Sequence, residues 1–228
     1  ISSDMGSLSF GDQIASATDR ADNIVSLSLF ECCTWSATLM DGMAGTNGQY
    51  HDGDNMSGAA NEGFEYTAPS MNGWTLRLSH MPTADRASEG ANDSNQASIS
   101  GSLAGISVAA GINSMGDAAT NTAGRDSSFV AASMGLGPMS VSVGMFEGGA
   151  AAADATTVVV DMPIMGMSGK AAFVDMDDSG GYDDSGYRLG LAKSLGAATF
   201  GIEYDNADTA SGDAGEIETW RLGYQVYF

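Results

Sequence analysis

The sequence is poor in basic residues, cysteine and proline, and it has no long apolar run. Lys and Arg number 8 against 29 Asp and Glu, giving a formal net charge of −21. Because phosphate contacts need clustered Lys and Arg, this composition argues against a nucleic-acid partner. The two cysteines are the neighbours Cys32 and Cys33, so neither a disulfide framework nor a CxxC zinc site is present.

Apolar runs such as Val158–Val160 are far shorter than the ~18 residues that a membrane-spanning helix needs. The chain opens Ile1-Ser2-Ser3-Asp4, without the basic start and apolar segment of a signal peptide. These features predict a mature chain, a fragment or a cytoplasmic protein. With 43% hydrophobic residues and a mean hydropathy of −0.06, the chain still has enough apolar surface to fold.

The last residues alternate between apolar side chains and polar or small ones, which predicts a β-strand with two unlike faces. Polar or small residues, Arg221 among them, occupy one parity. The other parity is apolar throughout: Trp220, Leu222, Tyr224, Val226 and Phe228. A strand of this length spans a bilayer when it is tilted.

Similar alternation recurs upstream and predicts eleven strands after a first one near 7–11: near 62–68, 74–81, 96–103, 106–113, 127–134, 139–146, 156–162, 167–176, 186–194, 198–206 and 217–228. Short connections, such as Ala104–Gly105 and Gly196–Ala197, alternate with long acidic ones. Tight turns on one rim and long polar loops on the other indicate a transmembrane β-barrel, which must close because backbone groups in lipid must all pair. A soluble β-sandwich, which also alternates, is the alternative.

The order of motifs resembles that of Gram-negative outer-membrane porins of the alphaproteobacterial general type. The closing Arg-Leu-Gly-Tyr-Gln-Val-Tyr-Phe resembles their final strand, and the segment 3–12 resembles the turn and strand before their long loop. The segments 135–141 and 195–200 resemble their periplasmic hairpins. The resemblance covers essentially the whole chain and implies one all-β barrel domain, 1–228, with a long third loop, 13–61, folded into the lumen.

Porins of this type have sixteen strands, and the long loop follows the fifth. The resemblance therefore implies that about twelve strands are present and that the first four are lacking, with Ile1 at the tail of the fourth. A native twelve-stranded barrel is the alternative to a sequence that omits part of the protein. We favour the omission, because an open twelve-stranded sheet would expose two long edges.

In the porins that this chain resembles, acids on the long loop face basic residues on the wall and narrow the lumen. The resemblance implies the following constriction candidates, each of which would otherwise be an ordinary solvated charge: Asp12, Asp19, Asp22, Glu31, Asp41, Asp52 and Asp54. Cys32 and Cys33 lie in the same loop, and nothing in the sequence gives them a function.

The alternation of faces along each strand assigns the basic residues of the barrel wall to the lumen or to the lipid side. If Phe228 faces lipid, then Arg77, Arg188 and Arg221 face the lumen, since a lipid-facing Arg costs about 2–4 kcal/mol at mid-membrane. We expect Lys170 to be luminal and Lys193 to face outward at a strand end. Glu203 also falls inward, where it either pairs with Arg188 or Arg221 or tunes cation flow.

The segment 177–186 holds a doubled Asp-Asp-Ser-Gly, and carboxylate oxygens suit Ca²⁺. The sequence lacks EF-hand spacing, so a solvated acidic loop is favoured over a calcium site at Asp177, Asp178, Asp183 and Asp184. No other cofactor is expected.

We therefore predict passive diffusion of small hydrophilic solutes and ions through a homotrimeric outer-membrane channel with mild cation preference. Its partners would be the lipid bilayer and lipopolysaccharide. An autotransporter translocator domain is the alternative barrel, but only about six residues precede the first strand, too few for its pore helix. An outer-membrane hydrolase is disfavoured, because His51 and His80 are the only histidines and no G-x-S-x-G motif occurs. The chain is therefore not expected to be an enzyme.

Overall fold

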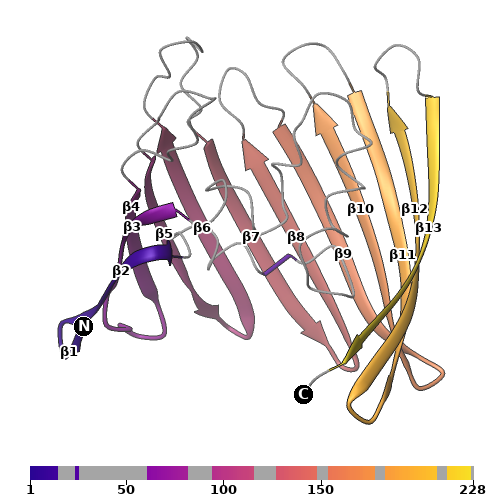
Figure 1. Cartoon of the computed structure of the whole chain (residues 1–228), viewed down its shortest axis with the longest axis horizontal. Coiled ribbons are helices and arrows are strands. Elements are labelled where there is room, and N and C mark those ends of the chain that lie inside the picture. The colour runs from indigo at the N-terminus through magenta and orange to yellow at the C-terminus, as the bar shows by residue number, and fades with distance from the viewer. Residues whose placement is uncertain are drawn as a thin grey trace.

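The computed structural model describes residues 1–14, 24–25, 61–81, 94–115, 127–147, 154–177, 183–209 and 215–226. The strands form one antiparallel sheet in chain order (Figure 1). They are β1 (Ser2–Ser3), β2 (Gly6–Ile14), β3 (Asn61–Thr67), β4 (Thr75–Met81), β5 (Ser94–Leu103), β6 (Ile106–Met115), β7 (Ser127–Leu136), β8 (Met139–Glu147), β9 (Asp154–Ile164), β10 (Met167–Asp177), β11 (Asp183–Leu195), β12 (Ala198–Thr209) and β13 (Gly215–Val226). Among these described residues, no helix is long and apolar enough to cross a membrane.

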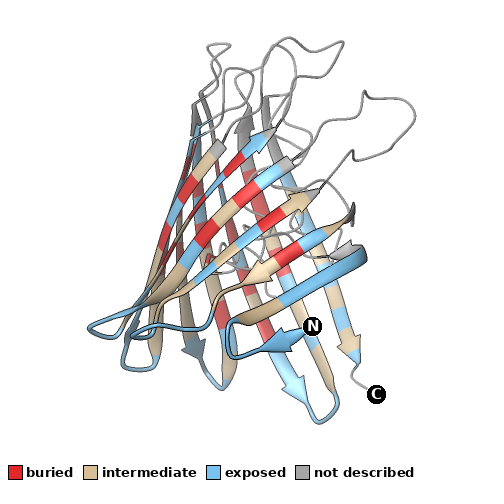
Figure 2. Cartoon of the chain, turned by 90° about the vertical axis from the view of Figure 1, so that its left-hand side faces the viewer, coloured by how far each residue is buried: buried red, intermediate tan, exposed pale blue. Residues whose placement is uncertain are grey.

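The sheet curls, and the short connections lie together at one end of it, so the strand ends that border the long connections lie at the other end (Figures 1 and 2). Every strand in the described part of the chain belongs to this one sheet, whose order begins at β1 and ends at β13. The all-β antiparallel prediction is therefore confirmed, and the β-sandwich alternative, which needs a second sheet, is wrong. The two-residue β1 pairs with β2 where the sequence placed the tail of an earlier strand.

The strand boundaries differ slightly from the predicted ones. Strand β2 continues to Ile14 and β3 begins at Asn61, so the connection predicted as 13–61 begins and ends inside strands. Strand β12 likewise runs to Thr209 rather than ending at 206. Polar residues near strand ends carry no apolar alternation, so the pattern cannot mark where pairing stops.

Tight turns at the short-connection end set the register of the hairpins. Ala104 and Gly105 have φ of 52° and 83°, and Met165 and Gly166 have φ of 52° and 76°. Positive φ at both central positions gives a turn whose twist matches that of the flanking strands. The left-handed conformation is easy for Gly, whereas Ala104 and Met165 adopt it against the preference of a residue with a Cβ.

The sheet has an apolar convex face and a polar or closely covered concave face. Along β8, Val143 and Met145 are 39% and 59% exposed, whereas the intervening Ser142 is 4% exposed. On β13, Leu222 is 81% exposed. Figure 2 shows buried and exposed residues alternating along the strands. A bare apolar convex face is the arrangement expected of a sheet whose outside meets lipid.

Aromatic rings on the convex face gather at two levels of β11–β13. Tyr204 lies 4.7 Å from Trp220 and 6.0 Å from Tyr187 between ring centroids, and its hydroxyl donates to Glu218 at 2.9 Å. Two residues beyond Leu222 on β13, Tyr224 stacks on Phe200 at 5.7 Å. Transmembrane barrels also carry aromatic residues on their outer face, concentrated toward the membrane interfaces.

Candidate functional site

Directly paired residues of neighbouring strands share a face of the sheet, so the register identifies the concave wall. One row of Cα partners crosses the sheet from β7 to β13. It runs through Ser133, Ser142, Val159, Ala172, Arg188, Asp205 and Thr219. Five of these seven side chains are buried, and Arg188 is 0% exposed. The wall is thus formed by alternate residues of many strands.

Arg188, Asp205 and Arg221 form an ion cluster that joins β11, β12 and β13. The Arg188 Nε donates to Asp205 Oδ1 at 2.5 Å, and its Nη2 donates to Oδ2 at 3.4 Å. Arg221 Nη2 lies 2.8 Å from the same Oδ2. One carboxylate therefore holds two guanidinium groups, with side-chain exposures of 0% for Arg188, 5% for Asp205 and 10% for Arg221.

Glu203 lies beside this cluster on the concave face and is 0% exposed. Its Cα partners are Gly190 and Arg221. The residue that holds both arginines is Asp205, which is not among the residues predicted from the sequence. The sequence contains a signal for this contact, because the tight Gly196–Ala197 turn fixes the register of the β11–β12 hairpin. Arg188 lies eight residues before Gly196 and Asp205 lies eight residues after Ala197, so the two are paired across the hairpin.

Lys170 occupies the concave face of β10, on the side predicted for it. Its Nζ lies 3.1 Å from Asp161 Oδ1, with side-chain exposures of 8% and 42%. The Ser140 hydroxyl donates to Asp161 Oδ2 at 3.4 Å. Lys193 is exposed on the convex face at the short-connection end, again on its predicted side.

Arg77 also lies on the concave face, but far from the other bases. It belongs to β4, seven strands before β11 in the sheet order. Its Nη1 donates to Ser100 Oγ of β5 at 3.0 Å. On neighbouring β3, Glu65 is 3% exposed and accepts a bond of 3.0 Å from the Thr67 hydroxyl. The structure thus brings Arg188 and Arg221 together and leaves Arg77 apart.

On β5–β8, between Arg77 and the Lys170–Asp161 pair, the described concave wall carries no charged side chain and is partly apolar. Phe129 and Phe146 are Cα partners, 3% and 4% exposed, and Val174 is 0% exposed. Val25, at 4% exposed, is buried although it belongs to no strand and falls within the predicted constriction loop. The assignment of the segment 13–61 as a loop narrowing a pore nevertheless stays a prediction.

The charges on the described concave wall balance. Where side chains are described, this face holds four bases and four acids: Arg77, Lys170, Arg188 and Arg221 against Glu65, Asp161, Glu203 and Asp205. The large negative charge of the chain is therefore carried by residues outside the described concave wall.

Most of the predicted acidic candidates lie outside the described residues. These are Asp19, Asp22, Glu31, Asp41, Asp52, Asp54 and Asp178, together with Cys32 and Cys33; for Asp12, Asp177, Asp183 and Asp184 only the backbone is described. Asp177 and Asp183 are Cα partners in β10 and β11. Within the described part of the chain, no group of three or more His, Cys, Asp or Glu residues is placed to hold a metal ion. The constriction acids and the calcium site stay predictions.

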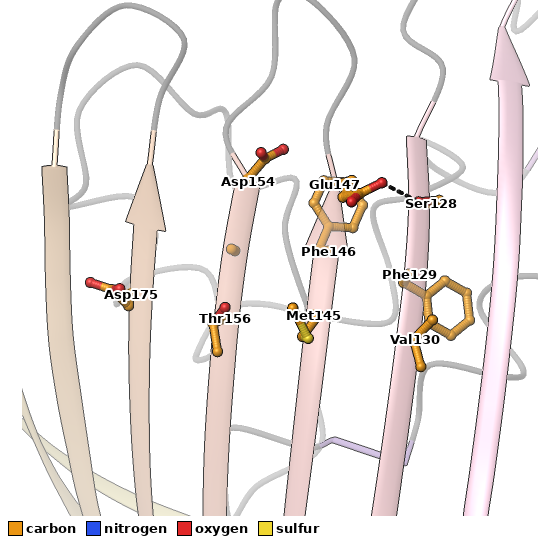
Figure 3. Close-up of a pocket in the computed structure, with 10 residues that line it drawn as sticks. Ser128, Phe129, Val130, Met145, Phe146, Glu147, Asp154, Thr156 and Asp175 are labelled. Carbon is orange, nitrogen blue, oxygen red and sulfur yellow. Dashed lines mark hydrogen bonds between the residues drawn. The ribbon is translucent and has the colours of Figure 1, made fainter.

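A depression of about 320 Å³ lies near the long-connection ends of β7–β10 (Figure 3). Convex-face side chains contribute to its lining, including Val130, Met145 and Asp175. The Ser128 hydroxyl donates to Glu147 Oε2 at 3.2 Å beside it. This depression includes exposed outward side chains and does not belong to the charged part of the concave wall.

A sequence model of the Gram-negative porin family matches residues 1–226. Among solved structures, the chain is similar to an engineered variant of the porin of Rhodopseudomonas blastica, with a TM-score of 0.55 and 22% identity over 73% of this chain and 55% of that one. It is also similar to a loop-deletion variant of OmpT, an outer-membrane protein of Vibrio cholerae, with a TM-score of 0.63 and 15% identity over 97% of this chain and 76% of that one.

The chain thus spans about half the length of the Rhodopseudomonas blastica porin chains, 55%. None of the curated proteins matches it in sequence. Similarity at these identities supports the fold, while the family match covers nearly the entire chain and favours a channel over an enzyme. The chain belongs to the Gram-negative porin family and is an outer-membrane protein.

Proposed function

We propose that the protein forms a water-filled channel for passive diffusion of small hydrophilic solutes and ions across the outer membrane. The observation that carries the proposal is the contrast between the two faces of one curled sheet. Its convex face exposes Leu222 and Trp220, whereas its concave face holds charges such as Arg188 and Asp205. Such a sheet faces lipid with one side and encloses a polar interior with the other.

The concave wall is suited to ions and polar solutes rather than to apolar ones. Serine hydroxyls, including Ser100, Ser133 and Ser142, and paired charges replace part of the hydration that a solute loses in a narrow passage. Passive diffusion needs no energy source and no cofactor. The wall therefore selects by polarity and charge. We infer that Asp12, which lies in β2 rather than in a loop, and the predicted loop acids from Asp19 to Asp54 narrow the passage.

We further propose a mild cation preference. The described wall is balanced in charge, whereas the whole chain carries −21. An excess of carboxylates near a channel entrance raises the local concentration of cations. Long acidic connections at one end of the sheet would supply this excess. The channel would act as a homotrimer in a bilayer whose outer leaflet is lipopolysaccharide.

Reconstitution tests this function directly. The complete protein, extracted from outer membranes in detergent, is added to planar bilayers, and single-channel conductance and reversal potential under a KCl gradient are recorded. Swelling of proteoliposomes in sugars of increasing size measures solute passage. We expect stepwise conductance, a cation-selective reversal potential and swelling rates that fall with sugar size. Folded protein that neither conducts nor permits swelling would refute the channel, and anion selectivity would refute only the cation preference.

A further inference from the structure

The Arg188–Asp205–Arg221 cluster places one carboxylate between two guanidinium groups on three neighbouring strands. Asp205 contacts Arg188 Nε at 2.5 Å and Arg221 Nη2 at 2.8 Å, and it is 3% exposed. We propose that Asp205 is one determinant of the ion selectivity of this channel, because it offsets the positive charge of the Arg188–Arg221 pair. This inference rests on the proposed channel function and concerns a residue of its wall.

Charge arithmetic supports a role beyond packing. With Glu203 beside it, the cluster has two bases and two acids. Replacing Asp205 by Asn keeps the size of the side chain and adds one positive charge to the wall, whatever else the arginines contact. Because the cluster is buried, water screens that charge poorly, and a low-dielectric wall directs its field into the aqueous passage.

The Lys170–Asp161 pair offers a matched control on the same face. It has the same type of acid, but that acid contacts one base and its side chain is 42% exposed. Solvent and salt screen the charge of an exposed carboxylate strongly, so neutralising Asp161 changes the field in the passage little, although Lys170 itself is only 8% exposed. Asp161→Asn therefore adds the same formal charge as Asp205→Asn with a smaller effect on ions in the passage.

The experiment measures reversal potentials of the complete outer-membrane protein in planar bilayers under a KCl gradient near 0.1 M. We expect Asp205→Asn to lower the cation-to-anion permeability ratio about two-fold or more, and Asp161→Asn to lower it less. Arg188→Gln should shift the ratio in the opposite direction. The double variant Arg188→Gln with Asp205→Asn has the wild-type charge and should return toward the wild-type ratio.

A gel-mobility comparison of unheated and boiled samples shows which variants are folded. If Asp205→Asn does not fold, Arg188→Gln and the double variant still test the proposal. A role in selectivity requires Arg188→Gln to raise the cation-to-anion permeability ratio and the double variant to return that ratio toward the wild-type value. A purely structural role would change folded yield and leave the ratio unchanged, which would overturn the inference. Equal shifts in Asp205→Asn and Asp161→Asn would overturn it as well. Absence of conductance in the wild type would instead refute the channel itself.

Discussion

Replacing Leu222 by Arg tests whether the convex face of β13 meets lipid. Leu222 is 81% exposed and pairs with Ile202 of β12. The Tyr204–Trp220 contact lies two residues away in one direction and the Phe200–Tyr224 contact two residues away in the other. Leu222 therefore lies on the bare convex face between two aromatic levels, in the part of β13 that is expected to meet lipid.

The size of the expected destabilisation depends on how far Leu222 lies from the membrane interface. Two residues of a strand cover about 7 Å, or about 5 Å along the membrane normal at a tilt of ~40°. An Arg at mid-bilayer on a barrel costs about 2–4 kcal/mol, and its long side chain reaches toward the nearer interface. We therefore expect Leu222→Arg to destabilise the folded protein by about 2 kcal/mol, which is about 30-fold in the folding equilibrium.

Thr219→Arg provides the control on the other face of the same strand. Thr219 is half-buried on the concave side and pairs in register with Asp205, which already holds Arg188 and Arg221. An added guanidinium there meets two bases as well as a carboxylate but does not enter lipid, so we expect a cost of about 1 kcal/mol, below that of Leu222→Arg. The assay is equilibrium folding of the complete protein into phospholipid vesicles across a urea series. Equal destabilisation by the two changes, or a larger cost for Thr219→Arg, would refute the two-faced reading of the sheet.

Three further changes have defined outcomes. Gly101→Val should displace the Trp74 ring, since a Cβ at Gly101 would lie 2.6 Å from it, and a shift in tryptophan fluorescence with about 1–3 kcal/mol of destabilisation would report this. Ala104→Gly relieves a φ of 52° and should raise stability by about 0.5–1 kcal/mol in the same urea assay, whereas a loss would contradict strain at this turn. Raising KCl from 0.1 to 1 M shortens the Debye length from about 10 to 3 Å. A cation preference that arises from solvated loop acids should therefore largely disappear in reversal-potential measurements. A preference that persists at 1 M would point to buried charges instead.

Alternation in the sequence was enough to predict the strands and the inward side of the arginines, because lipid-facing positions demand apolar residues. It failed where both parities are apolar. Along 129–134 one parity holds Phe129 and the other Val130, so alternation assigns neither face to lipid. The structure places Phe129 on the concave side at 3% exposed and Val130 on the convex side at 56%. A concave residue that is covered by other parts of the chain has no need to be polar, so periodicity carries no information there.

The contacts of Asp205 show which pairings can be predicted from the sequence and which require the three-dimensional structure. Its register against Arg188 follows from the tight Gly196–Ala197 turn, so counting along that hairpin would have found the contact. Its contact with Arg221 spans strands joined by a long connection, and a long connection leaves the register open. The sequence therefore supports one half of the cluster and the structure supplies the other.

The balance of charge on the wall changes how the arginines should be understood. Taken by themselves, Arg188 and Arg221 form a positive patch, which would oppose cations in the passage. Their shared carboxylate and the neighbouring Glu203 offset that charge within three strands, at 0–10% exposure. Because the described wall is then close to neutral, a cation preference would originate in the acids outside it. Selectivity in this chain would thus depend on two separable sets of charges, a screened set near the entrances and a buried, offset set on β11–β13.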